Sequence, residues 1–302
     1  MEFGESLKIC RERALLTQKE LVDALYVHDS ELFASLHTGT LGKWERDLTH
    51  PTGAKMASLL SFFQKHFAQT LPCLDLYKIE EIEALFSLEN MQYILGDSKE
   101  LILNFPSGVV KKNEIKVYNV TRPEEINRFV EINMDLDKDL TDNFSQITLT
   151  QFKAWAAYPS NTLLGCEYKD EFFGLLFTLK LKPEIFEKIM KYEMMEHELR
   201  IGDFAKQEEN GSEYVVSFFS MNKDAAALLF RRYFAYLATQ KTIFDIGASV
   251  IMEDAKKLLS KMSLSVYSVK KLEDGVKLAS YRDSLKNFFA SEGMMNALFK
   301  RK

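Results

Sequence analysis

Cysteine is scarce in this sequence, and long apolar runs are absent. The three cysteines, Cys10, Cys73 and Cys166, are odd in number and far apart, which argues against a disulfide framework or a thiolate zinc site and suits a reducing compartment. The longest strictly apolar runs have six residues, as in 225–230, whereas a helix that spans a bilayer needs about 20. The first residues also lack the apolar stretch of a secretory signal. We therefore expect a cytoplasmic protein that does not bind membranes.

An excess of positive charge is also missing. The formal net charge is −5, and residues 1–72 contain eight lysines and arginines against nine aspartates and glutamates. A nucleic-acid-binding protein usually presents a basic surface, so any DNA binding must be argued from sequence pattern. Gly-x-Ser-x-Gly elbows, Walker loops and dinucleotide glycine fingerprints do not occur, and no histidine pair has the spacing of metal ligands. We accordingly predict no catalytic, cofactor-binding or metal-binding residues.

What remains is an ordinary globular composition, with 46% hydrophobic and 27% charged residues among 302. This length predicts more than one domain. We expect an all-α domain over residues 1–67, a helical connector and candidate dimerisation element over 68–114, and an α/β or α+β domain over 115–302 that ends in a helix. The turn-forming run Phe105-Pro106-Ser107-Gly108 lies at the start of the last boundary region.

Apolar residues at helical spacing predict four helices in residues 1–67. The apolar positions of the first and fourth helices are Phe3, Leu7, Cys10 and Ala14, and Met56, Leu59, Leu60, Phe63 and Phe67. The second helix begins after Thr17, whose hydroxyl suits an N-cap, with Glu20 at the capping-box position. The third helix is short, carries Trp44 on its inner side and ends before Pro51.

Two segments of this helical stretch form an ordered pair of motifs. Residues 15–21 read Leu-Leu-Thr-Gln-Lys-Glu-Leu, and residues 40–46 read Thr-Leu-Gly-Lys-Trp-Glu-Arg, with Pro51 after them. The pair resembles the helix-turn-helix of the Cro/phage-repressor (Xre) family over residues 4–67. The resemblance implies that the second helix lies across a DNA groove while the third helix enters the major groove. It also implies that the protein binds double-stranded DNA as a homodimer.

The same resemblance assigns roles to individual residues. The implied DNA-binding residues are Thr17, Gln18, Lys19, Thr38, Gly39, Thr40, Lys43 and Arg46. Trp44 is expected in the core, and Glu45 is expected to pair with Arg46 at the helix end. The sequence departs from the family in three places, one of which is Asp47, which stands where the family has a glycine after the arginine. The loop between the second and third helices is longer, with an extra helical turn expected over 30–36, and His37 stands where the family prefers a serine-type cap.

Residues 115–281 alternate between strand and helix patterns. The predicted order is a strand, two helices, a hairpin over 162–181, a fourth strand, a long helix over 225–240, a fifth strand, another helix and two closing strands. A further helix is expected over 183–199. This order resembles the GNAT acetyltransferase fold. The resemblance implies that the fourth and fifth strands separate and that acetyl-CoA enters between them, with its pyrophosphate on the N-terminus of the next helix.

The segment that would hold the pyrophosphate departs from the family pattern. The family uses an Arg/Gln-x-x-Gly-x-Gly/Ala loop, because glycine lets backbone N–H groups approach phosphate. Residues 220–225 here read Ser-Met-Asn-Lys-Asp-Ala, so glycine is missing and Asp224 adds a negative charge. Leu259 stands where the family often has a tyrosine that acts as general acid. We therefore expect a degenerate GNAT-like domain that is not an enzyme and binds no cofactor.

Together these patterns favour a sequence-specific, DNA-binding transcriptional regulator. Its partners would be double-stranded DNA, a second copy of the chain, and a small-molecule effector or a protein at the GNAT-like domain. The candidate dimer surfaces are the helix expected over 78–91 and the C-terminal helix. Two alternatives stay open. One is an acetyl-CoA-dependent N-acyltransferase fused to a helix-turn-helix, and the other is an antitoxin-like or partner-binding protein.

Overall fold

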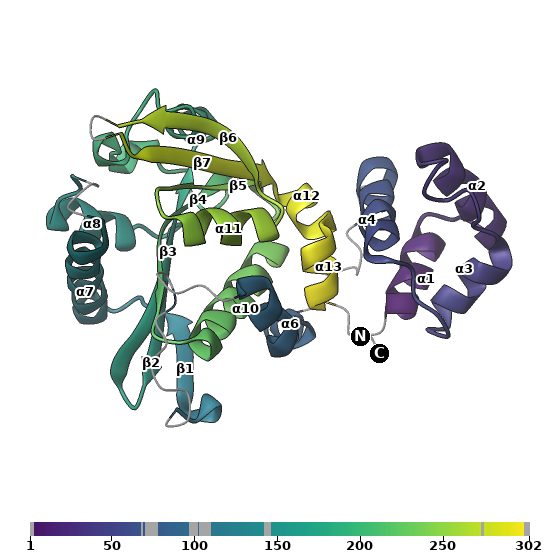
Figure 1. Cartoon of the computed structure of the whole chain (residues 1–302), viewed down its shortest axis with the longest axis horizontal. Helices are drawn as coiled ribbons and strands as arrows, with labels where there is room; N and C mark the ends of the chain where they lie inside the picture. Colours follow the sequence, from purple (N-terminus) through teal and green to yellow (C-terminus); the bar gives the residue numbers. More distant parts are fainter. Residues whose placement is uncertain are drawn as a thin grey trace. The chain divides into compact units, whose positions relative to one another are not determined.

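The computed structural model describes residues 3–67, 69, 78–96, 102, 110–141, 146–272 and 275–298 (Figure 1). Its internal contacts divide the chain into two compact units. The first unit contains Met1–Asn90, Phe234–Thr239 and Lys286–Lys302, and the second contains Met91–Tyr233 and Gln240–Leu285. The domain boundaries expected at residues 67 and 114 stay predictions. The turn expected over 105–108 lies outside the described residues.

Helices build the first unit. They are α1 (Phe3–Arg13), α2 (Gln18–His28), α3 (Thr38–Glu45), α4 (Gly53–Phe67), α5 (Ile79–Leu85) and α13 (Glu292–Leu298), while α6 (Leu88–Leu95), α10 (Lys223–Thr239) and α12 (Leu285–Ala290) have residues in both units. The four helices predicted over residues 1–67 are present. The single helix predicted over 78–91 is instead α5 and the start of α6, because the chain is extended at Phe86. The predicted C-terminal helix is likewise two short helices.

Local hydrogen bonds fix the starts of α2 and α3. The Glu20 N–H donates to Thr17 Oγ1 at 3.2 Å and the Thr17 N–H donates to Glu20 Oε2 at 2.7 Å, which is the predicted capping box. At α3 the Thr40 N–H donates to His37 Nδ1 at 3.2 Å, so an imidazole takes the place of the serine-type cap. The extra helical turn expected over 30–36 is present as hydrogen-bonded turns and not as a continuous helix: the Phe33 N–H donates to the Asp29 carbonyl oxygen at 3.1 Å, and the Leu36 N–H donates to the Phe33 carbonyl oxygen at 2.9 Å.

Close packing joins α1 to α3. A Cβ atom on Gly4 would lie 2.1 Å from the Trp44 carbonyl oxygen, so only glycine lets the two helices approach this closely. The Gly4 N–H donates to Asp47 Oδ1 at 2.8 Å, just beyond the end of α3. Trp44 is 4% exposed, which confirms its predicted place in the core.

A mixed sheet dominates the second unit. Its strands are β1 (Ile115–Asn119), β2 (Thr162–Tyr168), β3 (Glu171–Leu181), β4 (Gly211–Ser220), β5 (Ile243–Val250), β6 (Ser265–Lys271) and β7 (Lys277–Ser284). Its helices are α7 (Pro123–Thr141), α8 (Leu149–Ala156), α9 (Pro183–Met190) and α11 (Glu253–Lys261), with 3-10 turns η2 (Lys112–Glu114), η3 (Glu196–Glu198) and η4 (Ile201–Asp203). In the described part of the chain the sheet has seven strands in the order β1-β2-β3-β4-β5-β7-β6.

The strand pairing is mixed. Neighbouring strands are antiparallel except β4 and β5, which are parallel and are connected through α10. Figure 1 shows α7 and α8 on one face of the sheet and α10 and α11 on the other. The core on the first face includes Phe129, Trp155, Phe177, Phe186 and Tyr214. Residues 115–284 therefore have the predicted mixed α/β architecture.

The helix predicted over 183–199 is wrong in its second half. It ends at Met190, and Tyr192 has a φ of 59°, in the left-handed region through which an α-helix does not continue. The Glu193 N–H closes this end by donating to the Lys188 carbonyl oxygen at 2.9 Å. The chain then runs through η3 and η4 before β4. Because α9 ends at Met190, Tyr192 lies beyond the α-helix and Glu196 lies in η3.

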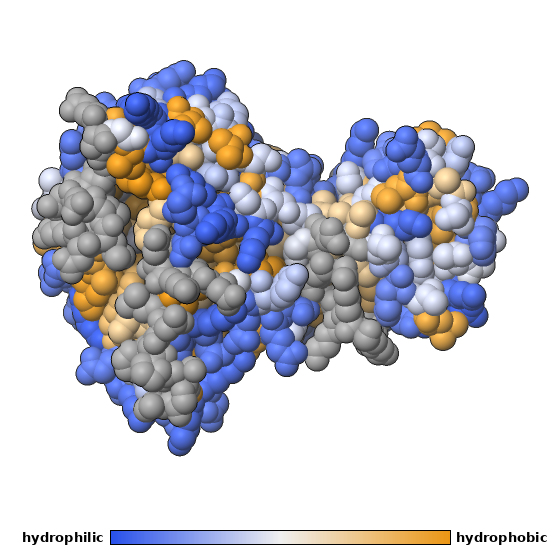
Figure 2. All heavy atoms as spheres, in the orientation of Figure 1, coloured by the Kyte–Doolittle hydropathy of each residue, from blue (hydrophilic) through white to orange (hydrophobic). Residues whose placement is uncertain are grey.

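The edge strand β6 exposes apolar side chains. Val266, Tyr267 and Val269 are 54%, 40% and 57% exposed. Figure 2 shows apolar residues among hydrophilic ones on this face of the molecule. Lys270 and Lys271 end the strand. Lysines at a sheet edge oppose the addition of a further strand. Lys270 and Lys271 therefore counteract the tendency of the apolar edge strand β6 to pair with another chain.

Candidate active site

The β4–β5 pair opens partway along β4. Pairing with β5 ends at Val215, although β4 continues to Ser220. On its other side, the register of β4 against β3 shifts between Val215 and Ser217, which leaves Val216 as an extra residue. An extra residue of this kind is a β-bulge, and a bulge bends its strand. The strand β4 therefore bends at the place where its pairing with β5 ends.

Polar side chains lie at this opening, on the face of the sheet that α9 covers. They are Tyr192, Glu196, Tyr214 and Ser249. Tyr214 is paired with Gly247, where a Cβ atom would lie 2.7 Å from Met190 Sδ, so α9 packs directly on β5. Ser249 follows Gly247 by two residues and points to the same face. Its partner on β7, Ser280, donates from Oγ to the Met190 carbonyl oxygen at 2.7 Å.

Tyr214 and Glu196 form a hydrogen-bonded pair. The tyrosine is completely buried, and its hydroxyl donates to Oε1 of Glu196, a half-buried residue of η3. Burial, together with the negative charge of Glu196, raises the pKa of Tyr214 well above its usual value. Tyr214 therefore keeps its proton and holds one carboxylate oxygen in place. A carboxylate fixed in this way suits a proton acceptor.

The hydroxyl groups of Tyr192 and Ser249 are in a different state. Both oxygens are shielded from solvent, and neither has a hydrogen-bond partner among the described residues. Burial raises the pKa of Tyr192 to about 12, while the nearby Ser249 and Ser280 hydroxyls act in the opposite direction. Tyr192 is therefore neutral at physiological pH and keeps a proton that it can donate. The two hydroxyls lie near each other and near Ser280 and Tyr214, but neither makes a hydrogen bond of normal geometry within the described residues.

The N-terminus of α10, which follows β4, does not fit a pyrophosphate. Asn222 caps it, with Oδ1 accepting the Ala225 N–H at 2.8 Å. Asp224 in the first turn lies 3.4 Å from Lys112 Nζ and accepts a hydrogen bond of 2.7 Å from Gln92 Nε2. A carboxylate at a helix N-terminus already serves the dipole and repels a second anion. The residues present are therefore unsuited to the pyrophosphate of acetyl-CoA.

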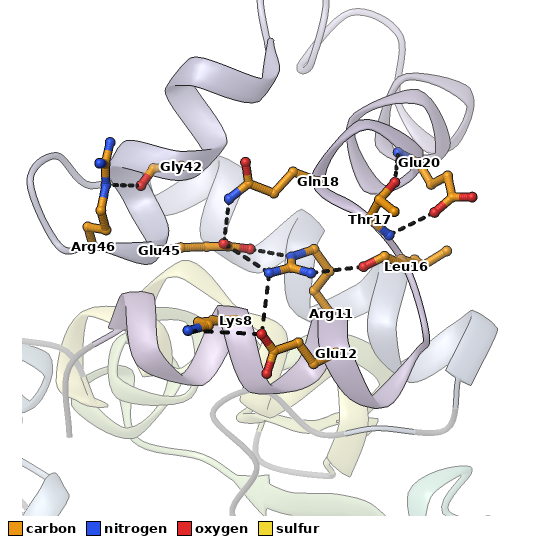
Figure 3. Close-up of polar contacts among 10 residues, drawn as sticks. All are labelled: Lys8, Arg11, Glu12, Leu16, Thr17, Gln18, Glu20, Gly42, Glu45 and Arg46. Atoms are coloured by element: carbon orange, nitrogen blue, oxygen red, sulfur yellow. Dashed lines mark hydrogen bonds and ion pairs between the residues drawn. The ribbon is translucent and has the colours of Figure 1, made fainter.

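In the first unit, some of the sequence-predicted residues surround an ion pair (Figure 3). Arg11 donates from Nε and Nη2 to the two oxygens of Glu45 at 2.5 and 3.1 Å, and from Nη1 to the Leu16 carbonyl oxygen at 2.9 Å. Gln18 Nε2 adds a bond of 2.8 Å to Glu45 Oε2. The network lines a pocket of about 500 Å³, whose lining residues are Lys8, Arg11, Gln18, Thr38, Gly39, Gly42, Glu45 and Arg46.

The predicted pair between Glu45 and Arg46 is wrong. Glu45 is 9% exposed and faces Arg11, whereas Arg46 is exposed and donates from Nε to the Gly42 carbonyl oxygen at 2.9 Å. Adjacent residues on a helix point in directions about 100° apart, so one of the two faces inward. Of the other predicted contact residues, Gln18 and Thr40 are half-buried, and the exposed ones are Thr17, Lys19, Thr38, Gly39 and Lys43. Their assignment to DNA stays a prediction.

Sequence reasoning missed Tyr192, Glu196, Tyr214 and Ser249 as a group. It placed Tyr192 and Glu196 inside one helix and assigned neither a partner. The available signal was weak: Ser249 follows the Gly-Ala pair at 247–248, near the end of a predicted strand. Only the register of β4, β5 and β7 brings these side chains to one face.

Two further expectations concern membranes and metals. None of the described helices is both long and apolar enough to cross a membrane. Over the described ranges there is also no cluster of three or more histidine, cysteine, aspartate or glutamate side chains that could hold a metal ion. The cytoplasmic location stays a prediction.

No family model and no curated protein matches this chain. Solved structures that are similar include an N-acyl amino acid synthase from uncultured soil microbes, with 13% identity and a TM-score of 0.41 over 59% of this chain and 94% of that one. An N-acetyltransferase from Staphylococcus aureus has 11% identity and a TM-score of 0.37 over 57% and 97%. A GNAT-family acetyltransferase from Streptococcus pneumoniae has 12% identity and a TM-score of 0.38 over 57% and 99%. At these identities the likeness is one of fold.

These findings contradict our main functional prediction. The similar structures are described as a synthase of N-acyl amino acids and as acetyltransferases, whereas we predicted a DNA-binding regulator that is not an enzyme. The expectations of transcription regulation and of a non-enzyme are therefore corrected. The helix-turn-helix resemblance receives no support from the comparisons. The alternative that contained an N-acyltransferase agrees with them better.

Proposed function

We propose that the second unit transfers an acyl group from a thioester to an amine. The opening between β4 and β5 carries this proposal, because a bulge, the end of a strand pair and a group of polar side chains coincide there. Beyond Val215, β4 has no partner strand in β5. A parallel bridge from Ile102 to Ser220 occupies the far end of this edge, which leaves the stretch 216–219 of β4 without a backbone partner on that side among the described residues. An extended donor molecule can bind along this stretch through backbone hydrogen bonds. The amine would approach from the face that α9 covers.

Glu196 is the proposed proton acceptor. The amine nitrogen attacks the thioester carbonyl carbon, a C–N bond forms, and the C–S bond breaks. The amine gives up a proton to Glu196, and this proton then passes to the departing thiolate, so that an amide and a free thiol are released. Tyr214 acts through Glu196 as a positioning residue, because its hydrogen bond fixes the carboxylate.

The donor is proposed as a thioester whose recognition does not depend on a pyrophosphate. Asp224 and its partners Lys112 and Gln92 make the N-terminus of α10 unfavourable for that group. Thioesters of N-acetylcysteamine contain the thioester and one amide but no phosphate. We therefore expect them to serve as donors about as well as the matching CoA thioesters.

The test is an acyl-transfer assay on the full chain. Acetyl-, hexanoyl- and dodecanoyl-thioesters of CoA and of N-acetylcysteamine would be paired with amino acids and simple alkylamines. Free thiol is measured with a thiol-reactive dye, and the amide product by mass spectrometry. We expect thiol release that requires both substrates and that falls in Glu196→Gln. Absence of amide product from every pair would refute the proposal.

The homodimer predicted from the sequence is a separate proposal. Sedimentation velocity of the full chain at micromolar concentration checks it, and a single monomeric species would contradict it.

A further inference from the structure

Tyr192 has two properties that packing does not explain. It has a φ of 59°, a conformation that glycine adopts at much lower cost than an aromatic residue. Its hydroxyl oxygen is shielded from solvent and has no hydrogen-bond partner among the described residues. A phenylalanine at this position would avoid the second cost. A tyrosine that bears both costs is a candidate for contact with a ligand.

Ser249 on β5 also has a buried hydroxyl without a hydrogen-bond partner among the described residues. It is the second residue of β5 after Gly247, and Gly247 pairs with Tyr214 of β4. Pairing of β5 with β4 ends at Ala248, so Ser249 is the first β5 residue past the last pair. Its hydroxyl thus lies at the opening.

The neighbouring groups come close to these hydroxyls without making hydrogen bonds of normal geometry to them. Ser280, opposite Ser249 on β7, donates its proton to the Met190 carbonyl oxygen at 2.7 Å. Tyr214 donates its proton to Glu196. Neither neighbour therefore has a proton left to donate to the Tyr192 or Ser249 oxygen. The hydroxyls of Tyr192 and Ser249 make no hydrogen bond of normal geometry in the described part of the chain, and both side chains belong to the α9 face of the same opening.

We infer that the hydroxyls of Tyr192 and Ser249 donate hydrogen bonds to the substrate carbonyl oxygen that becomes negatively charged during acyl transfer. This inference rests on the proposed function and deepens it. When the amine attacks, the C–N bond forms and the π electrons of the C=O bond move to oxygen. When the C–S bond breaks, the C=O bond re-forms and the thiolate leaves. Two preorganised neutral donors stabilise the intermediate charge in a site shielded from water.

The experiment combines kinetics with stability on Tyr192→Phe, Ser249→Ala and the double variant. We expect each single change to lower kcat about 10²-fold, with little change in KM for either substrate. We also expect no loss of Tm in either variant, because no hydrogen bond within the protein is broken. The matched control is Tyr267→Phe, which removes a tyrosine hydroxyl bonded to Glu187 on the surface and should keep full activity.

The outcomes separate this inference from the proposed function. If the unaltered protein forms no amide from any substrate pair, both fail. If it forms amide and the two variants match it, only the inference fails. A raised KM for the amine at unchanged kcat would show that the hydroxyls bind the acceptor, which also overturns the inference. A lower Tm in both variants would show that the hydroxyls stabilise the folded protein, and this result would also overturn the inference.

Discussion

Buried polar side chains are used differently in the two units. In the first unit, Glu45 accepts bonds from Arg11 and Gln18 on both of its oxygens, and Arg11 also bonds a backbone carbonyl. In the second unit, the oxygens of Tyr192 and Ser249 are buried beside a hydrogen-bonded pair but have no partner among the described residues. The network of the first unit is saturated, meaning that both Glu45 oxygens have hydrogen-bond donors, whereas the two hydroxyls of the second unit lack partners.

The difference separates groups that support a fold from groups that await a ligand. A saturated buried network recovers the solvation that its members lose, and it joins elements distant in the sequence. A buried donor without a partner loses its hydration, and no hydrogen bond within the protein compensates for that loss. Gln18, one of the residues in the sequence motif, is part of the saturated network that supports the fold. The residues that we propose for catalysis belong to the groups that await a ligand.

The largest expected effect is on catalysis in the second unit. Glu196→Gln keeps the shape of the side chain and removes the proton acceptor, so the rate of amide formation should fall about 10²- to 10⁴-fold. Steady-state kinetics with the best substrate pair measures it. Glu193→Gln is the control, because Glu193 is exposed and lies in the same segment. Equal losses in the two variants would point to a general effect of charge.

The next effect breaks the saturated network of the first unit. Arg11→Met leaves Glu45 buried without its cation, which should cost about 3–5 kcal/mol of unfolding free energy. Hydrogen exchange of the amides in α1 and α3 measures it within this unit. The double change Arg11→Met with Glu45→Met should recover most of the loss. A small effect of the single change would mean that the pair is weakly coupled to the fold.

A third prediction concerns an unsaturated carboxyl group away from the opening. Glu213 on β4 is fully buried, accepts a bond from Thr178 and has one oxygen without a partner among the described residues. Burial raises its pKa to about 7, against the opposing effects of Thr178 and Lys180. Between about pH 4.5 and 7 the unfolded chain ionises while the native carboxyl group keeps its proton.

Stability should therefore be highest below this window, fall as pH rises through it, and change no further above pH 7 on account of this group. The total loss is on the order of 3 kcal/mol. Glu213→Gln cannot ionise and should lack this part of the pH dependence. Denaturant unfolding of both proteins from pH 4.5 to 8 measures the difference. Parallel curves would mean that Glu213 is ionised in the native state.

The smallest expected effect is on the capping box of α2. Thr17→Ala removes the acceptor for the Glu20 N–H and should cost about 1 kcal/mol. Thr17→Ser keeps a hydroxyl and should restore most of it. Amide exchange in the first turn of α2 reports the change. An equal loss in the serine variant would show that the Thr17 methyl group, and not its hydroxyl, supports the helix.

Much of the fold could be predicted because its signals are local. Thr17 and Glu20 are three residues apart, and their reciprocal bonds form as soon as α2 forms. The β2–β3 hairpin turns at Lys169 and Asp170, whose φ angles of 54° and 64° follow from a two-residue connection between strands. The end of α9 was not predicted, because a tyrosine in the left-handed region carries no sequence signal for that conformation.

The amino-acid sequence alone determined the helices of residues 1–67, the alternation of strands and helices after residue 115, and the burial of Trp44, since helical and strand periodicities are properties of short windows. Tertiary structure alone decided that Glu45 meets Arg11, which lies 34 residues away, and not its neighbour Arg46. It also decided that Tyr192, Glu196, Tyr214 and Ser249 share one opening. That grouping depends on the register of three strands and on where α9 stops, and a shift of one residue in any strand would turn its side chains to the other face.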